Sequence, residues 1–94
     1  MSSDRPRVFI LAASRDQAHG FIQRWLAEDP TRRLQDAVYL GSRAAMQGRF
    51  VTDRDRVVAV EGHYRHRHAG QIEHELRRAL AKTGKNFDPE HVSA

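Results

Sequence analysis

Residues 57–70 read VVAVEGHYRHRHAG, and this stretch decides the fold that the chain predicts. Four apolar residues (57–60) come first, and a turn with two Arg, three His and no acid (62–70) follows them. An apolar run without alternation is typical of a strand buried on both faces, as in a parallel sheet. After the turn, apolar residues recur at helical spacing from Ile72 to Leu80. The stretch therefore predicts a buried strand, a basic turn and a helix.

The N-terminal part of the chain has the same order of strand and helix. Residues 7–13 are mostly apolar and predict a first strand. Ser14 is followed three residues later by Gln17, the spacing of a capping box, so a helix is expected to begin there. It should end near Glu28, because the residue before Pro30 avoids the helical conformation. Its apolar residues fall on one stripe, formed by Ala18, Phe21, Ile22, Trp25 and Leu26.

The rest of the chain completes the alternation of strands and helices. Residues 37–40 and 56–61 predict the second and third strands, and Ser42 can begin a short helix between them. Gly84 stands where the last helix needs a left-handed C-cap.

These elements predict an α/β fold: a small three-stranded, mostly parallel sheet flanked by helices, which is a minimal Rossmann-like arrangement. The strand order is 2-1-3 or 3-2-1. Residues 1–6 are expected to be a flexible N-terminus, 7–84 a single α/β domain and 85–94 a flexible C-terminal tail. Because so small a sheet leaves two open edges, we expect a homodimer to complete it.

Composition limits the classes of function. The 94 residues suffice for one domain, and the absence of Cys excludes disulfides, thiolate zinc sites and thiol nucleophiles. No apolar run is long enough for a membrane span, and the polar N-terminus lacks the apolar core of a signal peptide, so a cytoplasmic location is expected. The formal net charge is +4, and 14 of the 16 basic residues are Arg. Arg suits the recognition of phosphate or carboxylate, although a GC-rich coding sequence gives the same composition.

Basic and hydroxyl side chains follow all three predicted strands. In a parallel sheet the carboxyl ends of the strands share one edge, where helix N-termini point and ligands bind. We therefore expect an anion or nucleic-acid site at that edge. Its candidate residues are Ser14, Arg15, Ser42, Arg43, His63, Tyr64, Arg65 and Arg67. The alternative is that the Ser residues only cap helices, that the Arg residues are solvated, and that Tyr64 packs against the last helix instead of stacking on a base.

Metal binding and catalysis are less well supported. Three His of the turn and His74 lie near Glu61, but their spacing is not that of a metal motif and the Arg residues between them repel a cation. We expect no metal and no cofactor. Catalysis would require Glu61, His63 and Ser14 to meet in one cleft, so an enzyme is the third hypothesis.

One short segment resembles a known family. Residues 10–18, ILAASRDQA, resemble the strand followed by Ser/Thr-Arg-x-x-Ala in helicase and phage-terminase motor domains. That family hydrolyses nucleoside triphosphates with a phosphate-binding loop and an Asp-Glu pair, and this chain has neither. Nucleoside-triphosphate hydrolysis is therefore not expected.

Two hypotheses for function remain ahead of the enzyme. The first is a small non-enzymatic module that binds an anionic partner, a nucleic acid or a nucleotide phosphate, through the basic edge. The second is a protein-interaction module, such as a small phage- or host-encoded regulator, that uses its sheet edge or apolar surface.

Overall fold

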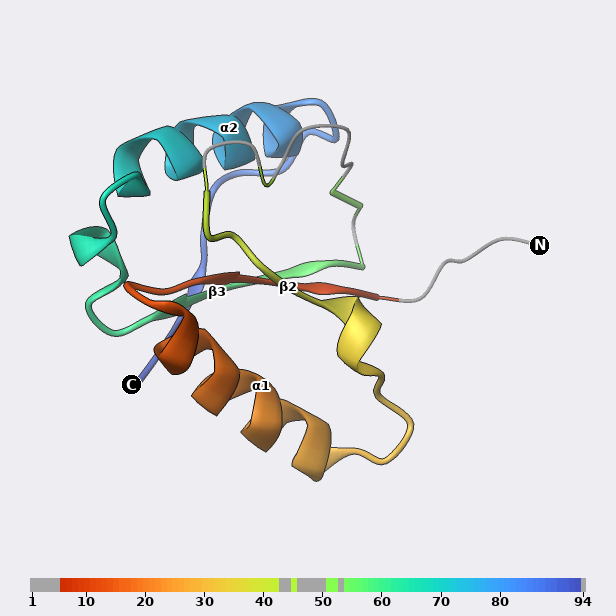
Figure 1. Cartoon of the computed structure of the whole chain (residues 1–94). Coiled ribbons are helices and arrows are strands. Elements are labelled where there is room, and N and C mark those ends of the chain that lie inside the picture. Colours follow the sequence, from red (N-terminus) through yellow and green to blue (C-terminus); the bar gives the residue numbers. More distant parts are fainter. Residues whose placement is uncertain (1–5, 43–44, 46–50, 53, 94) are drawn as a thin grey trace.

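The computed structural model describes residues 6–42, 45, 51–52 and 54–93, which form an α/β fold with helices on both faces of a sheet (Figure 1). The elements in chain order are β1 (Val8–Leu11), α1 (Arg15–Glu28), the 3-10 helix η1 (Leu34–Asp36), β2 (Ala37–Tyr39), β3 (Arg56–Val60), the 3-10 helix η2 (His63–Arg65), α2 (Ala69–Ala81) and β4 (Glu90–Val92). None of the described helices combines the length and the apolar character that crossing a membrane requires.

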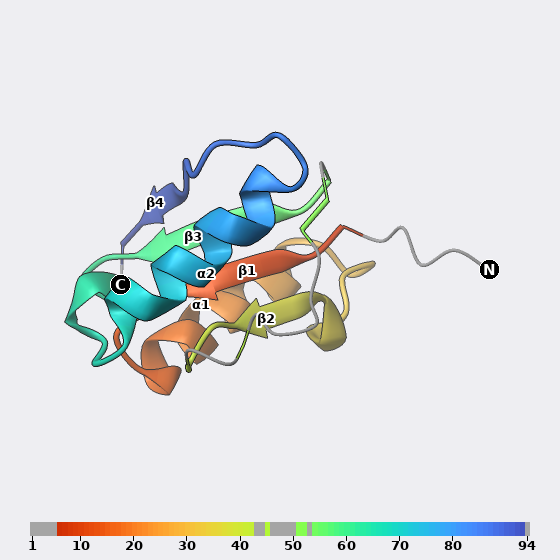
Figure 2. The same ribbon diagram turned by 90° about the horizontal axis from the view of Figure 1, so that it is seen from above.

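The four strands are parallel and lie in the order β2-β1-β3-β4 (Figure 2). The predicted parallel sheet is confirmed, and β1 lies between β2 and β3, as in the order 2-1-3. Helix α1 leads from β1 to β2, and α2 leads from β3 to β4. The two crossovers therefore lead away from the central β1–β3 pair in opposite directions.

The predicted count of three strands is wrong, because β4 pairs with β3. The Glu61 amide donates to the carbonyl of Val92 at 2.8 Å, and the Val92 side chain packs against the core on the α1 side. Arg56 on β3 donates two hydrogen bonds of 2.8 Å to the carboxylate of Glu90 on β4. The three residues of β4 include a single apolar side chain, so they show no strand periodicity. For this reason the sequence analysis placed them in an expected flexible tail, residues 85–94.

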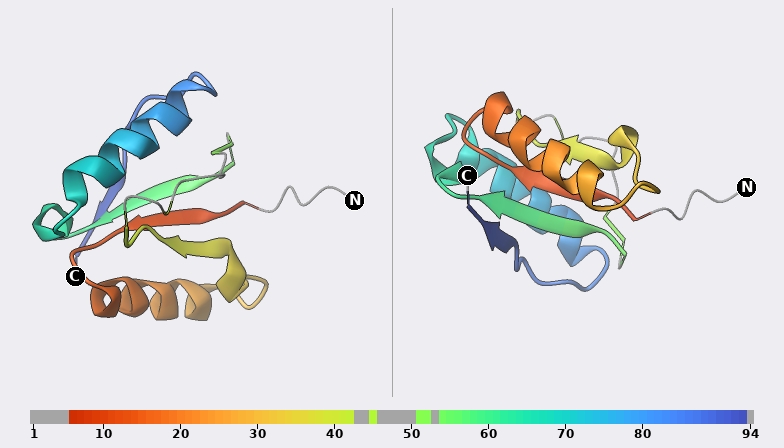
Figure 3. Two further views of the ribbon diagram at one scale, coloured as in Figure 1. Left: turned by 45° about the horizontal axis from the view of Figure 1, so that its top comes forward. Right: turned by 90° about the horizontal axis from the view of Figure 1, so that it is seen from below.

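Strand β1 is buried on both faces, as its continuous apolar run predicts. Successive side chains of a strand point to opposite faces. Helices α1 and α2 lie on opposite faces of the sheet (Figure 3). Phe9 and Leu11 belong to the core cluster on the α2 side, whereas Val8 and Ile10 belong to the cluster on the α1 side. The α2 cluster is completed by Val38, Leu40, Val51, Ala59, Ile72, Leu76 and Leu80. The α1 cluster is completed by Ala12, Ala18, Ile22, Trp25, Val58 and Val60.

Helix α1 begins and ends where the sequence predicts. The Gln17 amide donates to Oγ of Ser14 at 3.3 Å, and Oε1 of Gln17 accepts from the Ala13 amide at 3.3 Å. The first bond satisfies a backbone donor that the first turn would otherwise leave unpaired, and the second satisfies the amide of the residue before the N-cap. The helix ends at Glu28, and the next residue is extended before Pro30.

Helix α2 ends with the predicted left-handed glycine. Gly84 has a φ of +76°, a conformation that other residues seldom adopt. The Gly84 amide donates to the Ala81 carbonyl at 3.1 Å, and the Lys85 amide donates to the Leu80 carbonyl at 3.0 Å. The bonds satisfy carbonyls of the last turn and direct the chain back towards β4.

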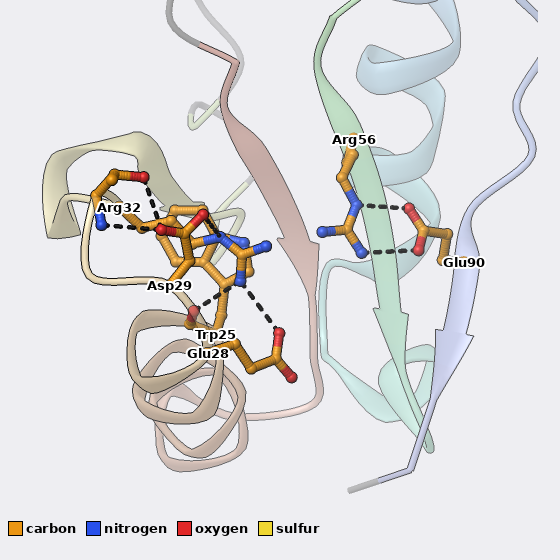
Figure 4. Close-up of polar contacts among 7 residues, drawn as sticks. Trp25, Glu28, Asp29, Arg32, Arg56 and Glu90 are labelled. Carbon is orange, nitrogen blue, oxygen red and sulfur yellow. Dashed lines mark hydrogen bonds and ion pairs between the residues drawn. The ribbon is translucent and has the colours of Figure 1, made fainter.

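Charged contacts hold together the edge of the sheet at which the strands begin (Figure 4). The Arg32 guanidinium lies 5.0 Å from the centre of the Trp25 ring and donates to the Trp25 carbonyl at 2.7 Å and to Glu28 at 3.1 Å. Arg56 and Glu90 join β3 to β4 in the same region. The charges of Arg32 and Arg56 at this edge are thus paired with carboxylates of the fold.

Asp55 forms a further contact at this amino edge. Its carboxylate accepts from the Thr52 amide at 2.8 Å, the Arg7 amide at 2.9 Å and the Arg7 guanidinium at 3.2 Å. Burial by itself raises the pKa of Asp55, but these hydrogen bonds and the positive charge of Arg7 outweigh it and lower the pKa. Asp55 therefore joins the start of β1 to the turn before β3.

Candidate functional site

The carboxyl ends of the four strands lie at one edge, because all four strands have the same direction. Ser14, Ser42 and His63 each stand three residues after the last residue of β1, β2 and β3. The crossovers diverge between β1 and β3, and ligands of open α/β sheets bind at such a point, beyond the carboxyl ends of the strands.

A cavity of about 220 Å³ opens at this edge, between the ends of β1 and β2 and the first turns of α2. Its apolar lining consists of Leu11, Ala12, Leu40, Ala69 and Ile72. Its polar lining consists of His63, Tyr64, His66 and Glu73. The fold thus brings an apolar surface and a group of polar side chains, from segments far apart in the sequence, into one hollow.

Helix α2 begins beside this cavity without a side-chain cap. His68 is its N-cap residue and makes no capping hydrogen bond through its side chain, and the first turn holds no acidic residue. The Ala69 amide donates to the His66 carbonyl at 3.0 Å, and the Ile72 amide donates to the His68 carbonyl at 2.9 Å. Gly70, between these two donors, lines the cavity. A helix N-terminus carries partial positive charge, so it stabilises an anion placed here.

The ring of His66 is held in the cavity wall by two contacts. The His68 amide donates to Nδ1 of His66 at 3.0 Å, so the neutral ring carries its proton on Nε2. The His66 ring also packs edge-on against Tyr39 of β2, with ring centres 6.5 Å apart. Burial raises the pKa of the Tyr39 hydroxyl, and the Arg15 guanidinium partly offsets this effect. Arg15 therefore acts electrostatically at the end of β2.

A second cavity, of about 440 Å³, opens beside the first between the ends of β3 and β4. Glu61, His63, Tyr64 and His91 line it, and the rings of His63 and His91 are 6.4 Å apart. His63 and Tyr64 line both cavities. Within the described part of the chain, no group of three or more His, Cys, Asp or Glu side chains is placed to hold a metal ion.

The structure places the basic turn at the two cavities. Arg65 and Arg67 are exposed on the same turn as His63 and Tyr64. The Tyr64 ring is exposed and lies 5.9 Å from the Arg65 guanidinium. The turn therefore presents two guanidinium groups and an aromatic ring to solvent beside the α2 N-terminus.

The predicted residues after β1 and β2 are less closely connected to the cavities. Ser14 lines neither of the two and caps α1 through its Oγ. Ser42 is exposed, and Arg43 lies outside the described residues. Glu61 and His63, two of the three residues that the enzyme hypothesis requires, line the second cavity, and Ser14 does not line it.

Sequence reasoning missed three residues of the site: Tyr39, Glu73 and His91. Glu73 forms an ion pair with Arg77 at 3.0 Å. Its position three residues after Gly70 places both on one face of α2, which is a signal that could have found it. Tyr39 and His91 reach the site through contacts between strands and loops that no local pattern shows.

The segment that resembles motor domains, residues 10–18, forms the end of β1 and the start of α1. Ser14 in it has a capping role. No protein-family model matches this chain, and neither a curated protein nor a solved structure matches it.

Proposed function

We propose that this protein is a small binding module that holds a phosphate-bearing anion at the carboxyl edge of its sheet. The observation that carries the proposal is the α2 N-terminus, which has no side-chain cap and opens on a cavity lined by His63, Tyr64 and His66. Backbone N–H groups of a first helical turn and the helix dipole both favour a negative charge at this point.

The charges of the basic turn beside the cavity favour an anion, whereas Glu73 in the cavity lining does not. Arg65 and Arg67 are exposed beside it, and residues 62–70 contain no acid. Guanidinium groups bind phosphate through paired, charge-assisted hydrogen bonds. In contrast, the Arg residues at the amino edge, such as Arg32 and Arg56, are bound to carboxylates of the fold. The proposed ligands are a nucleotide or the backbone of a nucleic acid.

The double variant Arg65→Gln/Arg67→Gln tests this function. Its affinity for inorganic pyrophosphate and for a single-stranded DNA of about twelve nucleotides should fall, because two phosphate contacts are lost. For the DNA, the slope of log affinity against log salt should become shallower by about 1.4, at about 0.7 for each phosphate contact to a single strand. Fluorescence anisotropy of labelled DNA at several salt concentrations and calorimetry with pyrophosphate give the two measurements.

The matched control is Arg33→Gln/Arg78→Gln, which removes the same charge. Arg33 precedes η1 at the amino edge, and Arg78 lies in the last turn of α2, so both are exposed and distant from the cavity in the chain's fold. The control should retain the affinity and the salt slope of the wild type. If both variants lose affinity equally, binding depends on net charge alone and the proposed site is wrong.

A further inference from the structure

The buried lining of the first cavity is apolar and does not stabilise a phosphate group. Leu11, Leu40 and Ile72 are at most 5% exposed and present apolar surface to the cavity. Apolar surface stabilises a ligand only by removing apolar atoms of that ligand from water. A ligand that fills this cavity therefore carries an apolar or aromatic part in addition to its negative charge.

Glu73 sets a second condition on the ligand. Glu73 lines the cavity, and its Oε2 accepts from Nε of Arg77 at 3.0 Å. The described residues give Oε1 of Glu73 no hydrogen-bond partner. An ionised carboxylate accepts hydrogen bonds and repels an anion. The part of the ligand that faces Glu73 thus carries N–H or O–H donors, and its negative charge lies elsewhere.

Tyr64 and the size of the cavity narrow the chemical class of the ligand. The Tyr64 residue is 68% exposed at the cavity, with the Arg65 guanidinium 5.9 Å from its ring, which is a suitable surface for stacking a planar ring. The volume of about 220 Å³ is below the roughly 300–1,000 Å³ of pockets for drug-sized ligands. The cavity accommodates one ring system and leaves larger groups outside.

We infer that the ligand is a nucleoside monophosphate, an inference that rests on the proposed anion site. Its base enters the cavity against the apolar lining and donates hydrogen bonds to Glu73. Its phosphate stays at the mouth, beside the N-terminus of α2 and within the basic turn. An apolar, planar and donor-bearing group meets all three conditions, and the phosphate joined to it meets the proposed anion site. Inorganic phosphate meets the anion site alone.

Calorimetry at low salt tests the inference with inorganic phosphate, the four nucleoside monophosphates and the matching nucleosides. At least one monophosphate should bind the wild type about tenfold or more tighter than inorganic phosphate, because the base adds stacking and burial. In Glu73→Ala this ratio of the two affinities should fall several-fold. The control Glu75→Ala removes the same charge and a weaker Arg pair from the same helix, at a position that does not line the cavity, and should keep the ratio.

The outcomes separate this inference from the proposed function. If inorganic phosphate binds and every monophosphate binds no tighter, the nucleotide assignment is wrong and the anion site stands. The assignment is also wrong if Glu73→Ala leaves the ratio unchanged, or if a single-stranded oligonucleotide binds while all four monophosphates fail. If no phosphate-bearing probe binds at all, the proposed function itself fails.

Discussion

At the scale of single residues, Asp55 shows how one buried side chain supports the edge opposite the candidate site. Its side chain is 1% exposed and accepts three hydrogen bonds, two of them from backbone amides. A buried carboxylate is stable only when its partners compensate for lost hydration. Here they do so to the extent that the pKa of Asp55 is lowered. Because the folded pKa lies below the unfolded one, ionised Asp55 stabilises the fold at neutral pH.

The variant Asp55→Asn should lower the free energy of unfolding by about 3 kcal/mol near pH 7, since it removes the charged partner of Arg7 and one of the acceptors. Asp55 contributes fully above its unfolded pKa, and the contribution is lost as the pH falls through its folded pKa. The difference between wild type and variant should therefore shrink in acid. Urea denaturation at a series of pH values measures it.

The ion pair of Arg56 and Glu90 provides a comparison with that of Arg7 and Asp55. It also joins an Arg to an acidic side chain, but both of its side chains are about half exposed. Arg56 lowers the pKa of Glu90, chiefly through the side-chain hydrogen bond. Solvent screens such a pair, so Glu90→Gln should cost less than about 1 kcal/mol. A loss as large as that of Asp55→Asn would show that exposure does not distinguish the two pairs.

At the scale of elements, α1 and α2 begin in different ways, and the difference concerns function. Ser14 and Gln17 cap α1, whereas α2 begins at His68 with no side-chain cap. A helix start without a cap is less stable by about 1 kcal/mol than one with a Ser, Thr, Asp or Asn cap. We propose that the helix start stays without a cap, at this cost in stability, because the proposed anion binds there.

Gly70 allows a direct test of this exchange between stability and binding. A Cβ added at Gly70 meets no atom within 4 Å, so Gly70→Ala fits the fold and should stabilise α2, by up to about 1 kcal/mol. The same methyl group stands at the cavity and hinders close approach of an anion to the backbone, so affinity for pyrophosphate should fall several-fold. Thermal denaturation and calorimetry measure the two effects.

Gly20 in α1 supplies the control, since a Cβ there also meets nothing within 4 Å and the residue is exposed within a helix. Gly20→Ala should stabilise the protein by about 0.5–1 kcal/mol and leave pyrophosphate binding unchanged. Equal binding by Gly70→Ala and the wild type would contradict the role given to the start of α2.

The elements that the sequence predicted correctly are those specified by neighbouring residues. The spacing of Ser14 and Gln17, the apolar run of β1 and Gly84 after α2 each involve only a few consecutive positions, and each predicted its structure. Strand β4 depends on pairing with β3 and on the contact of Glu90 with Arg56, 34 residues apart. A pattern read along three residues does not contain that information.

At the scale of the whole molecule, the candidate site exists only because the strands are parallel. The sequence indicated that basic residues follow the strands, and the parallel sheet brings the ends of those strands to one edge. The sequence did not indicate the cavity, because Leu11, Leu40 and Glu73 come together there only through tertiary packing. The homodimer expected from open edges stays a prediction, and β2 and β4 are those edges.

The most direct test of the anion site is a nuclear magnetic resonance titration of the ¹⁵N-labelled protein with inorganic pyrophosphate. The account predicts saturable shifts of the amides at Ala69, Gly70 and Gln71 and in the turn 63–68, with Asp55 and Arg56 at the opposite edge unchanged. Saturable shifts centred on the amino edge, or none at the start of α2, would contradict it.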